Sequence, residues 1–212
     1  MVFGGVLKGR VSVSTVVSAC IEGITNAQNQ YVSMSGGDWV YWAPEYFITS
    51  SIAQSLHNAS GKKYITIENG AYDALYYAGA VGRGRLHRDI RPSGRFDLLL
   101  WWAKGHPRAV IEVKNRVFNK SQYESDLKRI AAVISRKKDN STMEFGVFAF
   151  YSATKNSSSK FSHDILEQRK KIIKNNARKI IGDQFKVTLH TSETIVDDEH
   201  AWLAGCILIE HT

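Results

Sequence analysis

GRFDLLLWWAKGHPRAVIEVKN, residues Gly94 to Asn115, is the stretch that decides the fold of this chain. Two strongly apolar runs, Phe96–Trp102 and Ala109–Val113, flank a polar turn that contains Gly105 and Pro107. Apolar runs on both sides of such a turn are typical of a β-hairpin. We therefore expect two antiparallel strands here.

The hairpin register follows from the position of its turn. A turn near residues 104–105 pairs residues whose numbers add to about 209, which puts Asp97 opposite or diagonal to Glu112. Side chains alternate across a strand, so Glu112 and Lys114 are expected on one face and Ile111 and Val113 on the other. Two carboxylates and an amine would then meet at one end of a sheet whose other face is apolar.

Length and composition favour one domain of α/β type. With 212 residues, 43% of them apolar, the chain can bury a full core. Its net charge of +8 is compatible with a polyanionic partner, and equally with an ordinary basic surface. Cys20 and Cys206 are too few for a disulfide framework or a four-cysteine metal cluster, so a reducing cytoplasm is expected. No apolar run approaches the ~18 residues of a membrane span, so no membrane is expected as a partner.

Residues 1–40 are expected to form a helical extension. Val13, Val17, Cys20 and Ile24 have helical spacing within a helix predicted over 11–33. An alternative is a secretion signal, because residues 17–20 have the shape of a lipoprotein cleavage site. The apolar part of such a signal would be very short and would carry three hydroxyl side chains, which favours the helix.

Residues 43–151 are expected to form the core and residues 152–212 a closing helix and strands. In the core we expect a helix over 44–58, a strand over 64–68, an ambiguous segment over 71–80, the hairpin, a helix over 122–138 and a strand over 145–151. A basic helix over 162–181 and strands over 185–190 and 202–210 complete the chain. This order predicts a mixed sheet covered by helices.

The expected cluster of charges suits the hydrolysis of a phosphodiester. Hard oxygen ligands select Mg²⁺ or Mn²⁺, and two carboxylates with a backbone carbonyl are a common protein contribution. Asp97 and Glu112 would supply the carboxylates and Val113 the carbonyl. Lys114 would orient the attacking water or neutralise developing charge. The alternative is a hairpin that merely carries surface ion pairs.

The order of a strand Asp, a Glu-x-Lys on the next strand, and a following helix resembles the PD-(D/E)xK nuclease superfamily. The resemblance covers about Glu45–Tyr151 and implies a restriction-endonuclease-like α-β-β-β-α-β core. It implies that Asp97 and Glu112 are metal ligands, that Lys114 is the catalytic amine, and that Glu45 matches an acidic residue on the helix before the strands. Phe96 stands where the name of the superfamily has proline, a position that varies.

Several residues near this pattern have two readings. Glu45 in the first turn of a helix is favoured by the helix dipole whatever its function. Glu68, at a strand end, is either a solvated edge residue or a further site candidate. The stretch Asp126–Ile130 resembles helices of phage-defence nucleases, and equally an ordinary amphipathic helix with a charged outer face.

Two basic regions are candidates for binding phosphate. Arginine suits bidentate phosphate contacts, and five arginines precede Asp97 in a glycine-containing loop, which favours a nucleic-acid-binding role. They are Arg83, Arg85, Arg88, Arg91 and Arg95. The basic residues of the helix over 162–181 are more simply a solvated face.

These observations predict a Mg²⁺-dependent nuclease, with DNA as the expected substrate. The resemblance implies an endonuclease in a restriction or phage-defence setting, and a chain of this size would need a homodimer or a partner protein to select its target. One alternative is a non-catalytic nucleic-acid-binding or assembly module, and another is a ribonuclease toxin. No zinc pattern and no Walker or dinucleotide motif is present.

Overall fold

The structure is a computed structural model that describes residues 9–136 and 139–212. Within these residues one mixed sheet has the strand order β1-β2-β3-β4-β7-β5, and β6 pairs with β7. Only β3 and β4 run parallel among the paired strands described. The strands are β1 (Tyr64–Gly70), β2 (Arg95–Trp101), β3 (Pro107–Lys114), β4 (Phe145–Lys155), β5 (Phe185–Thr191), β6 (Ile195–Asp197) and β7 (His200–His211).

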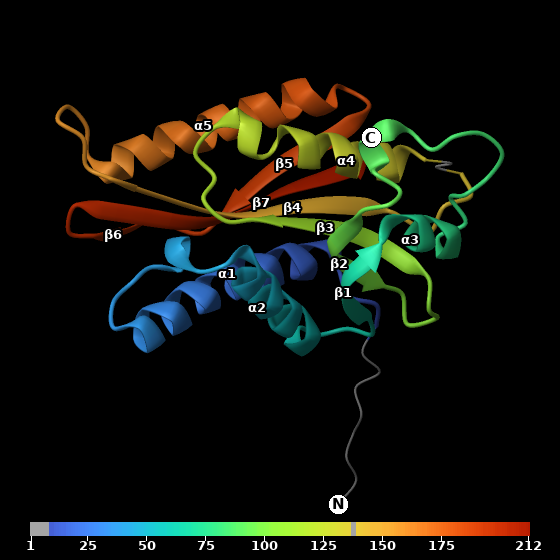
Figure 1. The fold of residues 1–212 in the computed structure, drawn as a ribbon, viewed down its shortest axis with the longest axis horizontal. Coiled ribbons are helices and arrows are strands. Elements are labelled where there is room, and N and C mark those ends of the chain that lie inside the picture. Colours follow the sequence, from blue (N-terminus) through green and yellow to red (C-terminus); the bar gives the residue numbers. More distant parts are fainter. Residues whose placement is uncertain (1–8, 137–138) are drawn as a thin grey trace, which may run out of the picture.

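Helices cover both faces of the sheet (Figure 1). One face is covered by α1 (Val13–Ser35) and α2 (Glu45–Asn58), and the other by α4 (Glu124–Ser135) and α5 (Ser162–Ile181). The short helix α3 (Ala71–Tyr77) follows β1. Three 3₁₀ turns complete the described elements: η1 (Val40–Trp42), η2 (Arg88–Ile90) and η3 (Lys120–Gln122). The predicted α/β class with a mixed sheet is confirmed.

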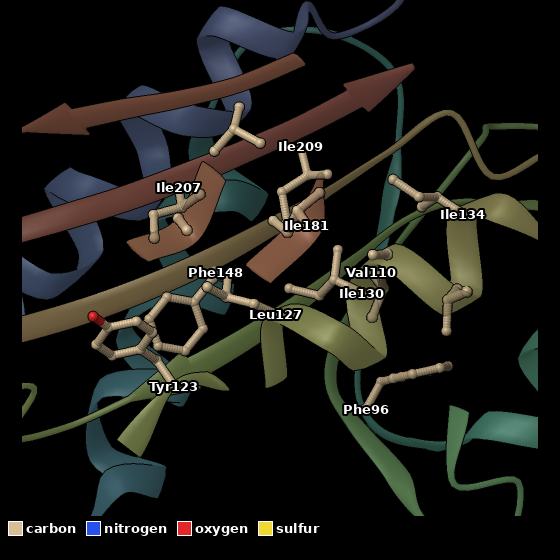
Figure 2. Packing of buried hydrophobic residues seen from close by; sticks show 14 of the residues in the cluster. Phe96, Val110, Tyr123, Leu127, Ile130, Ile134, Phe148, Ile181, Ile207 and Ile209 are labelled. Atoms are coloured by element: carbon tan, nitrogen blue, oxygen red, sulfur yellow. The ribbon is translucent and has the colours of Figure 1, made fainter. Parts of the chain in front are cut away.

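The two-sided packing follows from the strand sequences. Along β3, Val110 belongs to the core under α4 and α5, whereas Ile111 and Val113 belong to the core under α1 and α2. Central strands buried on both faces read as continuous apolar runs. Figure 2 shows the α4 side, where Leu127 and Ile130 point towards the sheet around Phe148.

The predicted hairpin register is confirmed. β2 and β3 are antiparallel, with Leu98 opposite Ile111, Leu99 opposite Val110 and Leu100 opposite Ala109. The ladder shifts only beyond Leu100, next to the turn. The alternation of side chains and the place of the turn therefore specify this register, as expected.

The predicted N-terminal helix is also confirmed, and it packs on the sheet. α1 packs along α2 and against β7, and Cys20 is fully buried in its middle. The first eight residues of the predicted extension lie outside the described residues. No helix of the described chain is long and apolar enough to cross a membrane.

Other element boundaries differ from the predictions by a few residues. The helix predicted over 122–138 begins at Glu124, because residues 120–122 form η3, and positions 137–138 lie outside the described residues. The ambiguous segment 71–80 contains helix α3. Strand β4 is longer than predicted, and the three residues of β6 were not expected because they are exposed and polar at one end.

Candidate active site

The ladder between β2 and β3 ends at the position of Asp97. The last paired residues are Leu98 and Ile111. Beyond them Val113 donates its N–H to Asp97 Oδ2, over 2.7 Å. The Asp97 carboxylate thus takes the place of the backbone acceptor that the next step of the ladder would offer to the Val113 N–H. The N–H and C=O groups of a strand residue point to the same side, so the Val113 carbonyl also faces the Asp97 side of β3.

The β1 strand is distorted beside Asp97. Glu68 has a φ of 58°, in the left-handed region, and the register skips from Ile67 opposite Leu98 to Asn69 opposite Phe96. A non-glycine residue in this region is uncommon and costs about 1–3 kcal/mol. The Glu68 side chain is exposed. Its place in a site stays a prediction.

Glu112 lies in the core under α4 and is paired with an arginine. Its Oε1 accepts a hydrogen bond from Arg129 Nη1 over 2.9 Å, and both residues are 4% exposed. Arg129 also donates to the carbonyl oxygens of Ile90 and Arg95, over 3.1 and 2.8 Å. Its guanidinium carbon lies 4.4 Å from the centre of the Phe96 ring. Helix α4 therefore holds one oxygen of Glu112 in a fixed position.

Lys114 connects the two helical layers at the end of β3. Its Nζ lies 3.1 Å from Glu45 Oε1 in α2 and 3.7 Å from Asp126 Oδ2 in α4. The other oxygen of Glu45 accepts the N–H of Asn115 over 3.0 Å. Glu45 is thus fastened to β3 at two adjacent residues. Asp126 in turn lies 3.7 Å from Arg91 Nη2.

The two strand carboxyls hold their protons more tightly than usual. Burial raises the pKa of Glu112 well above its ordinary value, and the neighbouring Asp97 raises it further, against the lowering effect of Arg129. Burial also raises the pKa of Asp97, against its hydrogen bonds from Val113 and with Glu112. Two buried carboxyls that interact this closely do not both ionise readily without a cation.

Lys114 stays an ammonium group at neutral pH. Burial lowers its pKa, but Glu45, Asp126 and Asp97 together outweigh this effect and raise the pKa above the usual 10.5. A protonated lysine donates hydrogen bonds and carries positive charge. It is not a general base here.

The donor set fits a hard divalent cation. Asp97 and Glu112 supply carboxylate oxygens, and the Val113 carbonyl faces the same side; these are the ligands that Mg²⁺ prefers, with water and substrate phosphate as further ligands. Among residues 9–136 and 139–212, no group of three or more His, Cys, Asp or Glu side chains is placed to hold a metal. A cation here would therefore depend on these two carboxylates, the Val113 carbonyl and oxygens from outside the protein.

The arginine loop reaches the site only through its later members. Arg91 contacts Asp126, and the backbone carbonyl of Arg95 accepts from Arg129. Arg88 and Arg91 line a hollow of about 530 Å³ together with Lys128 of α4. Arg83 and Arg85 are exposed in the preceding loop. Arg91, which contacts Asp126, thus brings this hollow next to the carboxyl cluster.

The sequence did not predict Asp126 and Arg129 as residues of the site, because the helix that carries them has an amphipathic pattern. The interpretation of Asp126 and Arg129 as part of a charged outer face is wrong, because they are only 8% and 4% exposed. A signal was present: Asp126 lies four residues before the inward Ile130, and residues four apart share a helix face. Lys128, which points outward, fits the amphipathic reading.

No protein-family model, curated protein or solved structure matches this chain.

Proposed function

We propose that this protein is a Mg²⁺-dependent nuclease acting on DNA, as an endonuclease. The observation that carries the proposal is the meeting of Asp97, Glu112 and Lys114 where the β2–β3 ladder ends. Glu45 accepts a hydrogen bond from Lys114, and Arg129 donates one to Glu112. The order of elements around the site, from α2 through β1, β2 and β3 to α4 and β4, supports a restriction-endonuclease-like core.

Each side chain has a separate role in this proposal. Asp97, Glu112 and the Val113 carbonyl would hold Mg²⁺, which when bound activates water and neutralises charge on the phosphate. The Lys114 ammonium donates a hydrogen bond to the attacking water or to a phosphate oxygen and stabilises charge that develops there. Glu45 holds the lysine in place, and Arg129 orients Glu112. Neither of these two would touch the substrate.

The charge distribution supports a nucleic acid as the substrate. The chain carries a net charge of +8. The hollow that adjoins the carboxyl cluster through Asp126 is lined by Arg88, Arg91 and Lys128 together with their acidic neighbours Asp89 and Glu124. Arginine binds phosphate oxygens in a bidentate manner, so the hollow suits a phosphate that flanks the one attacked. By the resemblance of its motif, a restriction or phage-defence role is part of the proposal.

Cleavage assays with a matched pair of lysine variants test the proposal. Plasmid and single-stranded DNA are incubated with Mg²⁺, with Mn²⁺ and with a chelator. We expect metal-dependent cleavage by the parent protein, a loss of roughly 100-fold or more in Lys114→Ala, and parental activity in Lys104→Ala, an exposed lysine in the turn between β2 and β3. Circular dichroism establishes that both variants fold. Metal-independent cleavage, no cleavage by the parent, or full activity in Lys114→Ala contradicts the proposal.

A further inference from the structure

A second, larger hollow lies next to the end of β3. Its volume is about 790 Å³, and it is lined by the η1 segment, Phe118, the end of β4, α5 and the β6–β7 turn. Trp39, Tyr41 and Trp42 form its aromatic wall with Phe118. We call these four residues the aromatic pocket wall. Nothing in the roles assigned to the carboxyl cluster uses them.

The aromatic pocket wall is fastened to the same strand that carries the site. Asn115 Nδ2 donates to the carbonyls of Val40 and Ala43, over 2.9 and 3.1 Å. Arg116 donates from Nε to the Tyr41 carbonyl over 2.6 Å, and its guanidinium carbon lies 4.5 Å from the centre of the Tyr41 ring. These two residues directly follow Lys114. The η1 part of the wall is therefore anchored to the two residues that follow Lys114.

Two rings of the aromatic pocket wall are largely exposed to solvent instead of packed in the core. Trp42 is 63% exposed and Phe118 is 50% exposed. Trp42 meets Tyr41 edge to face at 5.0 Å, and the Arg116 guanidinium carbon lies 5.4 Å from the centre of its ring. Exposed rings beside a concavity mark a binding surface, and flat rings of this kind are platforms for nucleobases.

The polar groups around the wall suit one base with its sugar and phosphate. Arg169 and Lys155 carry positive charge and suit a phosphate, whereas Asp38, Asp197 and Asp198 are acceptors for base amino groups or a sugar hydroxyl. A groove that binds a continuous phosphate backbone would be lined by cationic side chains alone. The mixture of acidic and basic side chains in this pocket therefore favours a single inserted nucleotide. Arg169 is already held by Ser152 and the Ala153 carbonyl, which preorganises its charge.

The pocket lies within a few nucleotides of the proposed site. Three residues lie between Lys114 and Phe118, so their Cα atoms are at most about 14 Å apart. That distance corresponds to about four stacked nucleotides at 3.4 Å each. A base inside a duplex cannot reach such a wall without leaving the stack.

We infer that the aromatic pocket wall binds one unpaired nucleobase of the substrate strand, so that the protein acts on single-stranded or locally unpaired nucleic acid. The inference rests on the proposed function for the position of the attacked phosphate, and it adds the substrate class. Base stacking tolerates any sequence, so recognition here reads strandedness instead of base identity.

Binding measured in chelator tests the inference separately from cleavage. A short fluorescein-labelled single strand and its blunt duplex are titrated with the parent, Trp42→Ala, Phe118→Ala and Tyr64→Ala, and anisotropy is recorded. Tyr64 is the control because it is 58% exposed and lies on β1, which β2 and β3 separate from β4 and the pocket. Quenching of tryptophan emission by the unlabelled strand is the second measurement.

We expect the parent to bind the single strand more tightly than the duplex. Each pocket variant should lose about 5- to 150-fold in affinity for the single strand, with duplex binding unchanged, and Tyr64→Ala should bind as the parent does. Equal affinity of parent and pocket variants, or equal loss in the control, overturns the inference even if the protein cleaves DNA. If the pocket variants lose affinity for the single strand as expected but the parent shows no metal-dependent cleavage, the pocket is supported and only the proposed nuclease activity is overturned.

Discussion

Within the described residues Glu112 forms an ion pair with Arg129 alone, and replacement of Arg129 by methionine removes this partner. The guanidinium donates to Glu112 and to two backbone carbonyls, at distances between 2.8 and 3.1 Å. Methionine has a similar length and fills much of the volume above Phe96, so the cavity that remains is small. The main effect is thus electrostatic: a buried carboxyl, the buried Ile90 carbonyl and the partly buried Arg95 carbonyl lose their donor.

The expected cost is about 3–5 kcal/mol in the free energy of unfolding, because removing one partner of a buried pair leaves the other uncompensated. The raised pKa of Glu112 moves the expectation to the lower end, since this group can take up a proton when Arg129 is gone. In a domain of about 200 residues each kcal/mol corresponds to about 2–4 °C, so the midpoint should fall by roughly 6–12 °C.

Urea unfolding followed by circular dichroism measures this effect in four proteins at neutral pH. They are the parent, Arg129→Met, Glu112→Gln and the double variant. The neutral amide removes the stranded charge, so the double variant should regain part of the stability that Arg129→Met loses. Lys128→Met on the exposed side of α4 is the matched control and should change stability little. A loss in Arg129→Met no larger than in the control, or strictly additive effects in the double variant, would refute the reasoning.

Three further predictions concern pH, packing and charge. Asp97 and Glu112 bind protons more tightly in the folded protein than in the unfolded chain. Without a divalent cation, the free energy of unfolding should therefore fall as pH rises above 4.5, the ordinary pKa of Glu112. Added Mg²⁺ should raise the thermal midpoint more at mildly alkaline than at mildly acidic pH. A Cβ at Gly205 would collide with the Phe150 ring, so Gly205→Ala should cost about 1–3 kcal/mol in urea unfolding, and an unchanged midpoint would contradict this packing. Joint replacement of Arg88 and Arg91 by alanine should reduce the slope of log affinity for DNA against log salt by about 1.4–1.8, measured by anisotropy, if each arginine contacts one phosphate.

Much of the central sheet was predictable because its determinants are local. The hairpin from Gly94 to Asn115 needs only a turn and an alternating pattern, so its register and the approach of Asp97 to Glu112 follow from residues close in sequence. The position of Glu45 beside Lys114 was expected only from the resemblance of the motif. Its hydrogen bonds to Lys114 and Asn115 join residues about 70 positions apart, which no local pattern encodes.

The amino-acid sequence by itself determined the α/β class, the strands and helices of the core, and the approach of Asp97 to Glu112. The tertiary structure decided that Arg129 and Asp126 are buried and that the aromatic pocket wall adjoins the end of β3. The physical reason is the range of the interactions. Turn geometry and side-chain alternation act over a few residues, whereas the burial of a charge and the shape of a pocket depend on which distant elements pack together.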